Sequence, residues 1–473
     1  MAESDTPRAP SPLDLAVRAI SRRDVLKGAV GVAGIAATSG ILAACSGGAS
    51  PAASSAAPAA SSAAPASSAP ASAAPSVGGS ITVGSNYSDE VPKKVFANII
   101  DTFTKQSGVQ VKVNTVDHGT FQDQISSYLQ GTPDDVFTWF SGFRMRFFAA
   151  QGLATDISDV WSKVGSHFSD AFKVGSTGDD GKQYFIPIYN YPWAVFYRKS
   201  VFADKGYQIP ATLDDLKSLS TQMQKDGLVP FAFGDKDGWP AMGTFDILDL
   251  RLNGYDFHVG LMAGKEKWTD PKVQQVFTTW KELLPFHQEG APGRTWQDAA
   301  QALVQKKAGM YLLGMFVSQQ FQATNNKADL EDLDFFPYPS LGTQYDAEKA
   351  LDAPIDGLMI SAHSPDLQKD LDAAKAFLEY IADPKTQVDW VTQDPSNVAA
   401  AKDADTSSYS PLQKKAAQLI GDAQRITQFL DRDTNPNFAG ANGMQAFLLD
   451  FLKNPNQDLG SFTNKIQSFW DTL

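Results

Sequence analysis

The sequence predicts an α/β protein whose folded part comprises two domains. Short apolar segments with the two-residue period of strands alternate with segments whose apolar residues recur at helical spacing. Gly and Pro separate many of these segments, as turns require. The stretch from residue 80 to residue 473 is also longer than one hydrophobic core usually serves.

The first domain begins with alternating strand and helix patterns. Residues 80–84 form a predicted strand, and Val95, Ile99 and Phe103 then recur at helical spacing, ahead of a C-terminal glycine at Gly108. A second strand is predicted over residues 109–113.

A second helix is predicted from the spacing of Phe121, Ile125 and Leu129, and residues 135–139 form the next predicted strand. This β-α-β-α-β order predicts a largely parallel sheet with right-handed crossovers. Ligands bind beyond the carboxyl ends of such strands, which are residues 86–89 and 139–142 in this chain.

The middle of the chain starts a second unit of mixed structure, and the sequence from residue 370 onward is mostly helical. Strands are predicted near residues 186–197, 309–314, 333–339 and 357–361, and helices over 213–225, 245–252, 273–284 and 296–307.

The N-terminal segment has the pattern of an export signal. Paired arginines at Arg22 and Arg23 precede an uncharged Gly/Ala-rich run, which ends in Leu42-Ala43-Ala44-Cys45. The pair resembles the twin-arginine signal, and the run resembles the lipobox of bacterial lipoproteins, so residues 1–45 are a predicted signal peptide with lipidation at Cys45. An uncleaved membrane anchor is the alternative, although the run is short for a spanning helix.

Cys45 is the only cysteine, so the chain has no thiol pair for a structural disulfide. Residues 46–79 are almost only Ala, Ser, Pro and Gly, and they carry no charge and no aromatic side chain. Such a segment cannot bury enough apolar surface to fold. We therefore expect a disordered tether between the membrane and the folded body.

Net charge limits the classes of ligand. The chain carries 40 Lys and Arg against 53 Asp and Glu, a formal charge of −13. A negative surface argues against nucleic acid as a partner, because phosphates need a cationic footprint. The same balance makes an anionic ligand less favoured.

Several short segments carry a family resemblance by their order and spacing. They are residues 134–139, 186–193, 238–240, 308–312, 353–357 and 431–434. From residue 80 to residue 473 the chain resembles the family 1 extracellular solute-binding proteins, the carbohydrate-binding group that serves ABC importers.

The resemblance implies a two-lobed periplasmic-binding-protein-like fold, with hinge crossovers and a ligand cleft between the lobes. The expected lobes are residues 80–191 with 338–397, and residues 192–337 with 398–473. The expected partners are a carbohydrate, ABC permease subunits with a separate ATPase, and the membrane through a lipid on Cys45. The expected state is a monomer at the outer face of the cytoplasmic membrane.

A sugar site needs planar hydrogen-bonding groups for hydroxyls and aromatic rings for C–H faces. Trp296 could be a structural anchor or a ligand contact. The candidate ligand-binding residues are Asn86, Tyr87, Asp89, Asp135, Trp139, Ser141, Asn190, Tyr191, Trp193, Asp237, Trp239, Met315, Asp356, Gly357, Asp431 and Arg432.

Catalytic patterns are weaker. The chain has no phosphate-binding loop and no Gly-x-Ser-x-Gly motif, and its five histidines are scattered. Residues 235–238 begin like a calcium loop but lack the later acidic ligands. We expect no metal, no cofactor and no catalysis, but capture of a sugar or oligosaccharide by lobe closure. The alternatives are an extracytoplasmic carbohydrate hydrolase and a binder of another solute, such as a polyamine, peptide or phosphate ester.

Overall fold

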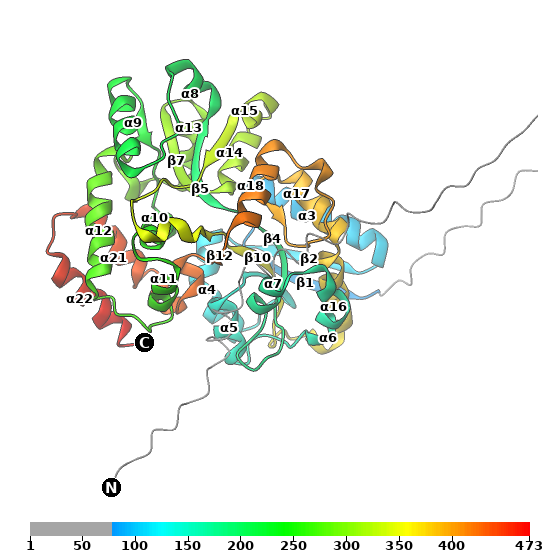
Figure 1. The fold of residues 1–473 in the computed structure, drawn as a ribbon. Helices are drawn as coiled ribbons and strands as arrows, with labels where there is room; N and C mark the ends of the chain where they lie inside the picture. The colour runs from blue at the N-terminus through cyan, green and yellow to red at the C-terminus, as the bar shows by residue number, and fades with distance from the viewer. Residues whose placement is uncertain (1–77) are drawn as a thin grey trace, which may run out of the picture.

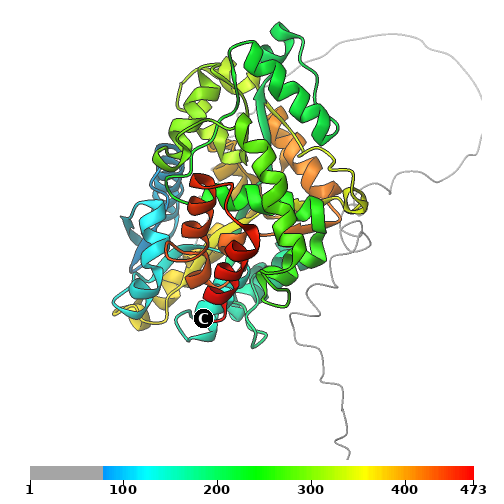
Figure 2. The same cartoon turned by 90° about the vertical axis from the view of Figure 1, so that its left-hand side faces the viewer.

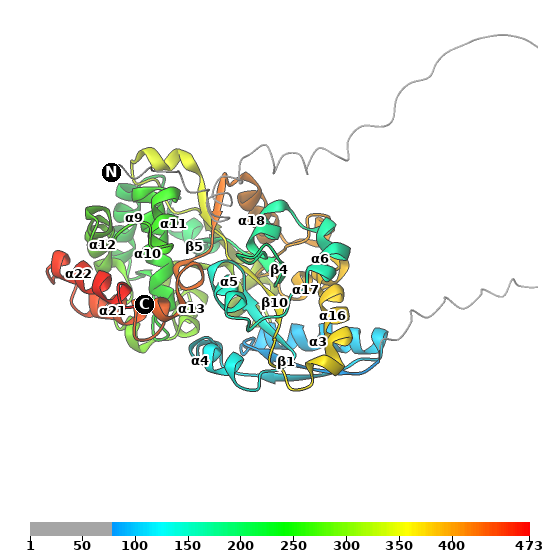
Figure 3. The ribbon, with the colours of Figure 1, turned by 90° about the horizontal axis from the view of Figure 1, so that it is seen from below.

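The protein is a two-lobed α/β molecule, and the computed structural model describes residues 78–473 (Figure 1). The predicted signal peptide, Cys45 and the predicted tether up to residue 77 lie outside the described residues. No helix within residues 78–473 has the length and hydropathy needed to cross a membrane. The two lobes lie side by side when the molecule is seen from below (Figure 3).

One lobe is built on a six-stranded sheet with the order β11-β4-β10-β3-β1-β2. Its strands are β1 (Ser80–Ser85), β2 (Gln110–Thr115), β3 (Val136–Phe140), β4 (Ile186–Asn190), β10 (Ile355–Ile360) and β11 (Val398–Ala399). The first three strands pair in parallel, as predicted, but β10 runs antiparallel to both β3 and β4, and β11 runs antiparallel to β4. The predicted largely parallel sheet is therefore mixed, because later segments insert in the opposite direction.

Helices of six to eighteen residues surround the six-stranded sheet. They are α3 (Glu90–Ser107), α4 (His118–Gln130), α5 (Phe143–Ala150), α6 (Ser158–Val164), α7 (Asp170–Gly175), α16 (Leu367–Ala382) and α17 (Pro384–Gln393). Helix α3 shows why the local sequence folds this way. Val95, Ile99 and Phe103 are buried along one face, and Gly108 ends the helix in the left-handed conformation that glycine adopts without strain.

The other lobe is built on a four-stranded sheet with the order β6-β7-β5-β8. Its strands are β5 (Trp193–Arg198), β6 (Val229–Phe231), β7 (Ala308–Gly314) and β8 (Leu333–Phe336). Helices α8 (Lys199–Lys205), α9 (Leu213–Lys225), α10 (Trp239–Asn253), α11 (Tyr255–Met262), α12 (Pro271–Leu283), α13 (Trp296–Val304), α14 (Ser318–Gln322) and α15 (Lys327–Asp332) follow these strands.

The C-terminal helices α21 (Met444–Lys453) and α22 (Leu459–Trp470) pack on α10 and α12 of the four-stranded lobe (Figure 2). Two one-turn helices precede them, α19 (Leu430–Asp433) and α20 (Pro436–Ala439). The aromatic contact between Phe277 and Phe451, with ring centroids 4.9 Å apart, ties α12 to α21. The end of the chain thus completes the core of this lobe.

The chain passes between the two sheets three times. It leaves β4 at Asn190 and enters β5 at Trp193, and it returns between β8 and β10. The third passage follows β11, which still pairs with β4, so it begins after Ala399 and not at the predicted boundary of 397/398. Helix α18 (Pro411–Asp422) and the short parallel pair β9 (Ala350–Asp352) and β12 (Arg425–Thr427) accompany these passages.

Candidate ligand-binding site

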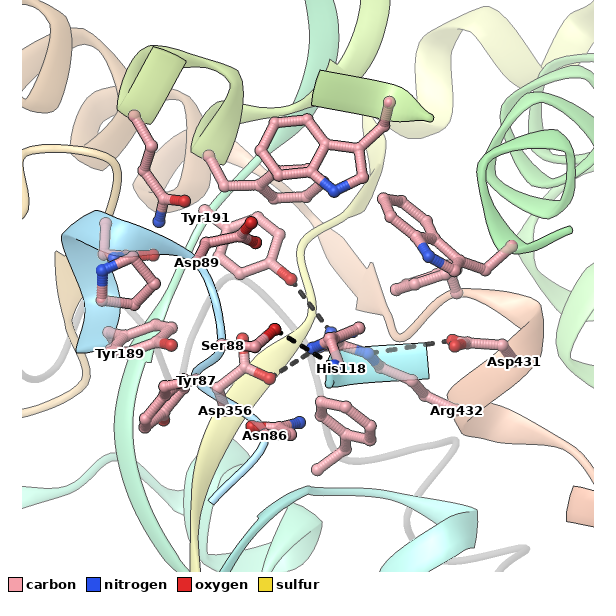
Figure 4. A pocket seen from close by; sticks show the side chains of 18 residues that line it. Asn86, Tyr87, Ser88, Asp89, His118, Tyr189, Tyr191, Asp356, Asp431 and Arg432 are labelled. Atoms are coloured by element: carbon pink, nitrogen blue, oxygen red, sulfur yellow. Dashed lines mark hydrogen bonds and ion pairs between the residues drawn. The ribbon is translucent and has the colours of Figure 1, made fainter. Parts of the chain in front are cut away.

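A pocket lies between the two lobes and draws its walls from both of them (Figure 4). Its volume is about 80 Å³, which is room for roughly five to eight water molecules. Its lining residues are Asn86, Tyr87, Ser88, Asp89, Pro92, His118, Phe140, Tyr189, Tyr191, Trp239, Trp296, Phe316, Gln319, Asp356, Asn397, Phe429, Asp431 and Arg432.

The six-stranded lobe supplies side chains from one edge of its sheet. Asn86 follows the carboxyl end of β1, Phe140 ends β3, and Asp356 lies at the beginning of the antiparallel strand β10. The carboxyl ends of parallel strands and the amino end of an antiparallel strand meet at the same edge. Asn86 Oδ1 accepts a hydrogen bond from Thr138 Oγ1 at 2.9 Å, and Asp356 pairs in register with Phe140.

The four-stranded lobe supplies an aromatic wall. Trp239 begins α10 and Trp296 begins α13, and Phe316 follows β7. The Phe316 ring lies 5.0 Å from the Trp296 ring and 5.7 Å from the Trp239 ring, both in edge-to-face geometry. Such rings present flat, electron-rich area with little conformational entropy to lose.

Arg432 of α19 is the electrostatic centre of the pocket. Its Nη1 lies 3.0 Å from Asp356 Oδ1, and its Nη2 donates to Tyr191 Oη at 3.1 Å. The guanidinium also stacks on the Phe140 ring at 3.9 Å. Since α19 packs with the four-stranded lobe while Asp356 and Tyr191 belong to strand ends of the other sheet, Arg432 couples the two lobes.

Two buried carboxylates flank this arginine. Burial raises the pKa of Asp431 to about 6, while Arg432 and Arg144 act in the opposite direction. Burial also raises the pKa of Asp356, against the attraction of Arg432. Arg144 lies 3.9 Å from Asp431 Oδ2, and its Nη1 donates to Gln122 Oε1 at 2.6 Å. With Asp89, the lining of the pocket holds three carboxylates and one guanidinium group, which disfavours an anionic ligand.

One buried oxygen atom in the pocket, Asp431 Oδ1, makes no hydrogen bond within residues 78–473 and faces Arg432 Nε at 3.8 Å. The buried Tyr87 hydroxyl has the Tyr189 hydroxyl as its hydrogen-bonding neighbour. Buried polar groups are normally satisfied, so an unpartnered group in a cavity wall is one that a ligand or water can complete. Tyr87 offers a hydroxyl and Asp431 a carboxylate, a combination suited to a molecule with several hydroxyl groups.

His118, the first residue of α4, offers its ring to the pocket as a neutral side chain. Desolvation, with a smaller effect from Arg432, lowers the pKa of His118 to about 4. Its Nε2 lies 2.9 Å from Gln122 Nε2, which can donate to it. His118 therefore adds no positive charge to the pocket near neutral pH.

Half of the sixteen candidate residues line this pocket. They are Asn86, Tyr87, Asp89, Tyr191, Trp239, Asp356, Asp431 and Arg432. The structure brings them together from the end of β1, the first and second passages between the lobes, the beginning of α10, and α19.

Three candidates lie elsewhere for reasons of strand geometry. Asp135 precedes β3, at the opposite edge of the sheet, and accepts hydrogen bonds from Thr82 N at 2.7 Å and from Ser364 Oγ. Trp139 and Asn190 point away from the pocket, because neighbouring residues in a strand face opposite sides. Phe140, Tyr189 and Tyr191 take the pocket side.

The remaining candidates support the site from behind or lie beside it. Trp193 is fully buried and packs on Trp239 at 6.3 Å, and Met315 and Ser141 are also buried outside the lining. A Cβ on Gly357 would lie 2.0 Å from the Ile186 carbonyl oxygen, so this glycine permits close strand pairing. Asp237 is half-buried next to the pocket without lining it.

Ten lining residues were not among the candidates. Ser88, Pro92, His118, Phe140, Tyr189, Trp296, Phe316, Gln319, Asn397 and Phe429 make up this set. Strand alternation from Tyr191 could have found Tyr189, and the rule on carboxyl ends, applied to β2, could have found His118. Gln319 and Asn397 meet only through the fold, where both amides donate to Asp394 Oδ2 at 3.1 Å. Within residues 78–473, no three His, Cys, Asp or Glu side chains are grouped to hold a metal ion.

The chain matches the model of the bacterial extracellular solute-binding protein family over residues 80–388. It is 25% identical over 404 residues to the alpha-glucosides-binding periplasmic protein AglE of Rhizobium meliloti (strain 1021), covering 80% of this chain and 84% of that protein. It is 23% identical over 342 residues to an uncharacterized ABC transporter extracellular-binding protein, PH1214, of Pyrococcus horikoshii, covering 70% and 74%.

Solved structures give the same result. The bacterial solute receptor AcbH, described as having an exclusive substrate preference for β-D-galactopyranose, is 47% identical with a TM-score of 0.79, covering 83% of this chain and 99% of that chain. A chitin oligosaccharide binding protein shares the fold with a TM-score of 0.72 at 22% identity, covering 83% and 98%. The two-lobed fold, the match over residues 80–388 and these relatives show that the chain belongs to the bacterial extracellular solute-binding protein family.

Proposed function

We propose that this protein is the sugar-binding component of an ABC importer and that it captures one neutral pyranose ring by closing its lobes around it. The pocket carries this proposal: a small cavity between two lobes joins an aromatic wall to buried hydroxyl and carboxylate oxygens. A pyranose offers C–H faces to the rings and hydroxyls to the oxygens.

The size and charge of the cavity support a monosaccharide over a longer or charged ligand. The small pocket between the lobes favours a single ring over an oligosaccharide. Three carboxylates, on Asp89, Asp356 and Asp431, stand against the single cation of Arg432. β-D-galactopyranose is the first candidate, because AcbH, the relative with 47% identity, is described as preferring it.

Lobe closure supplies the transport signal. Ligand contacts to both lobes favour the closed arrangement over an open one, and Asp356 and Asp431 sit on opposite sides of that division. The permease, which works with a separate ATPase, then recognises the closed form. A lipid on Cys45 would hold the protein at the outer face of the cytoplasmic membrane, with residues 46–79 as the tether.

The function is tested by a thermal-shift screen of the purified protein against neutral sugars, disaccharides, sugar phosphates and polyamines. A ligand that binds only the folded state raises the melting temperature with concentration. The expected result is a shift with galactose and little or none with sugar phosphates. A shift with spermidine alone would favour the polyamine alternative, because the acidic pocket suits a cation.

The hydrolase alternative is tested in the same samples. Galactosides and oligosaccharides are incubated with the protein for a day, and the products are separated and identified. Binding of sugar with no cleaved product is expected from a binding protein. Cleavage that disappears in Asp356→Asn or Asp431→Asn would establish a glycosidase instead.

A further inference from the structure

Helix α19 carries Asp431 and Arg432 but has too few residues to fix its own position. It spans Leu430–Asp433, which is a single turn, and one turn gains little from its internal hydrogen bonds. Its placement in the pocket must therefore come from contacts with neighbouring elements. One such contact is a hydrogen bond that the first residue of α19 donates to a side chain of α10.

Asp246 of α10 makes this contact. Its Oδ2 accepts a hydrogen bond from the backbone N–H of Leu430, the first residue of α19, at 2.7 Å. The side chains of Asp246 and Leu430 are both fully buried, and Asp246 does not line the pocket. Asp246 thus holds the backbone next to the two charged residues without reaching the cavity.

A cluster of buried polar groups lies beside Asp246. His258 of α11 pairs through Nδ1 with Asp249 Oδ2 at 2.9 Å, and Asn253 donates to Asp249 Oδ1 at 2.7 Å. His258 Nε2 lies 3.9 Å from Asp246 Oδ1, which is beyond hydrogen-bond distance. The cluster therefore contacts Asp246 electrostatically, and the hydrogen bond to Leu430 is the one that Asp246 makes to α19.

Burying the carboxylate of Asp246 costs free energy of folding, so stability alone does not explain its presence. Burial, with the neighbouring Asp352 carboxylate, raises the pKa of Asp246 far above its usual range. Apolar side chains of similar volume often fill such a site at equal or lower cost. What an apolar side chain cannot supply is a directional acceptor for the Leu430 N–H.

The contacts on the pocket side need accurate placement of α19. Arg432 donates to Tyr191 Oη at 3.1 Å and lies 3.0 Å from Asp356. A displacement of about 0.5 Å would take either contact beyond the normal hydrogen-bond range. The positions of Asp431 and Arg432 in the pocket should therefore depend on how the first residue of α19, Leu430, is held.

We propose that Asp246 is a positioning residue: through the backbone of Leu430 it places Asp431 and Arg432 in the pocket, and it sets ligand affinity without touching the ligand. This inference rests on the proposed function, since its measure is sugar binding.

The test compares two substitutions at this position by calorimetric titration with galactose. Asp246→Leu removes the acceptor while filling the space, and Asp246→Asn keeps an oxygen that can accept from Leu430. Galactose affinity is expected to fall at least tenfold in Asp246→Leu and to stay within about threefold of wild type in Asp246→Asn. Asp246→Ala replaces the leucine variant if the latter does not fold.

A matched control separates positioning from general loss of stability. Asp332 lies in the same lobe and also accepts a backbone N–H, that of Ser200, at 2.7 Å, but far from the pocket lining. Asp332→Ala should lower the melting temperature and leave galactose affinity unchanged. In Arg432→Lys protein, where the placed group is already altered, adding Asp246→Leu should cost less affinity than in wild type.

The outcomes separate the two proposals. If folded Asp246→Leu binds galactose as tightly as wild type, or if Asp332→Ala weakens binding equally, the positioning role is overturned. If Asp246→Asn is as weak as Asp246→Leu, the hydrogen bond to Leu430 is not the cause, which also overturns it. If wild-type protein binds no sugar at all, the proposed function fails first.

Discussion

The two walls of the pocket are built from different chemistry. The six-stranded lobe contributes mainly hydroxyl, amide and carboxylate groups from strand ends, such as Asn86, Tyr87 and Asp356. The four-stranded lobe contributes mainly rings, such as Trp239 and Trp296, from the first residues of helices. One lobe thus supplies most of the hydrogen-bonding groups, and the other supplies most of the aromatic rings. A ligand contacts both sets only when the two lobes close around it.

Helix α19 contacts both walls of the pocket. It packs with α10 and α11 of the four-stranded lobe, yet its Asp431 and Arg432 meet Arg144, Asp356 and Tyr191 of the other lobe. Ligand affinity should therefore depend most on this junction, less on the aromatic wall, and least on contacts at the margin.

The largest effect is expected from Arg432→Met. This change leaves Asp356 buried without its cation and Asp431 with Arg144 alone, and breaking a buried pair typically costs about 3–5 kcal/mol of stability. Galactose affinity should fall by at least a hundredfold, measured by calorimetry, with urea unfolding for stability. Arg425→Met removes an arginine that pairs with Asp256 at the surface, so it should change little. If Arg432→Met binds galactose as tightly as wild type, the contacts that Arg432 makes between the lobes do not determine ligand affinity.

The aromatic wall is tested by Trp239→Ala. Loss of the ring face should weaken galactose binding tenfold or more, which is about 1.4 kcal/mol. Trp239→Phe should be intermediate. Trp280→Phe is the control, because Trp280 is fully buried against Phe451 and lies outside the pocket lining. Unchanged affinity in Trp239→Ala would mean that the ring supports the fold but not the ligand.

The ionised form of Asp431 is tested by pH. Its pKa is raised to about 6, above the unfolded value near 4. If a sugar hydroxyl donates to the carboxylate, affinity should fall as pH drops below 6, by up to about tenfold per unit. The stability contribution has the opposite sign. The folded state binds more protons between pH 4 and 6, so that contribution is lost as pH rises through this window.

Calorimetry at pH 5, 6 and 7 measures the first effect, and melting of the ligand-free protein measures the second. Asp431→Asn should remove the pH dependence of affinity between pH 5 and 7 and reduce that of the melting temperature, to which other buried carboxyl groups such as Asp235 also contribute. An affinity that is flat from pH 5 to 7 in wild type would contradict a role for the ionised carboxylate.

The smallest effect is expected at the margin of the pocket. Gln297 of α13 donates to Asp89 Oδ1 at 2.9 Å and so links the two lobes directly. A net hydrogen bond of this kind is worth about 0.5–1.5 kcal/mol. Gln297→Ala should therefore speed galactose release about two- to tenfold in stopped-flow measurements, with little change in melting temperature. An unchanged release rate would show that this bond does not hold the closed form.

Much of the fold followed from local patterns in the sequence. The periodicity of Val95, Ile99 and Phe103 located α3, and helix α9 spans the predicted residues 213–225. The antiparallel insertion of β10 between β3 and β4 did not follow, because no local signal records which strands become neighbours after a long excursion. Direction within a sheet is a property of the whole path of the chain.

Pocket residues at strand ends could be predicted from the sequence, and most of the others could not. Asn86 follows from the rule on carboxyl ends of strands and lines the pocket, as does Asp356 at the beginning of β10, whereas Asp135 lies outside the lining because it precedes β3. Gln319 lines the pocket only through its place on α14, and Asp246 acts through a contact 184 residues away in sequence. Such long-range contacts have no local pattern to predict them.

The most direct test of the whole account is a calorimetric titration of the wild-type protein with D-galactose, D-glucose and lactose under one set of conditions. The account predicts one site per chain, tight binding of a monosaccharide, and much weaker binding of lactose, whose second ring exceeds the cavity. Tighter binding of the disaccharide, or no heat from any neutral sugar, would contradict it.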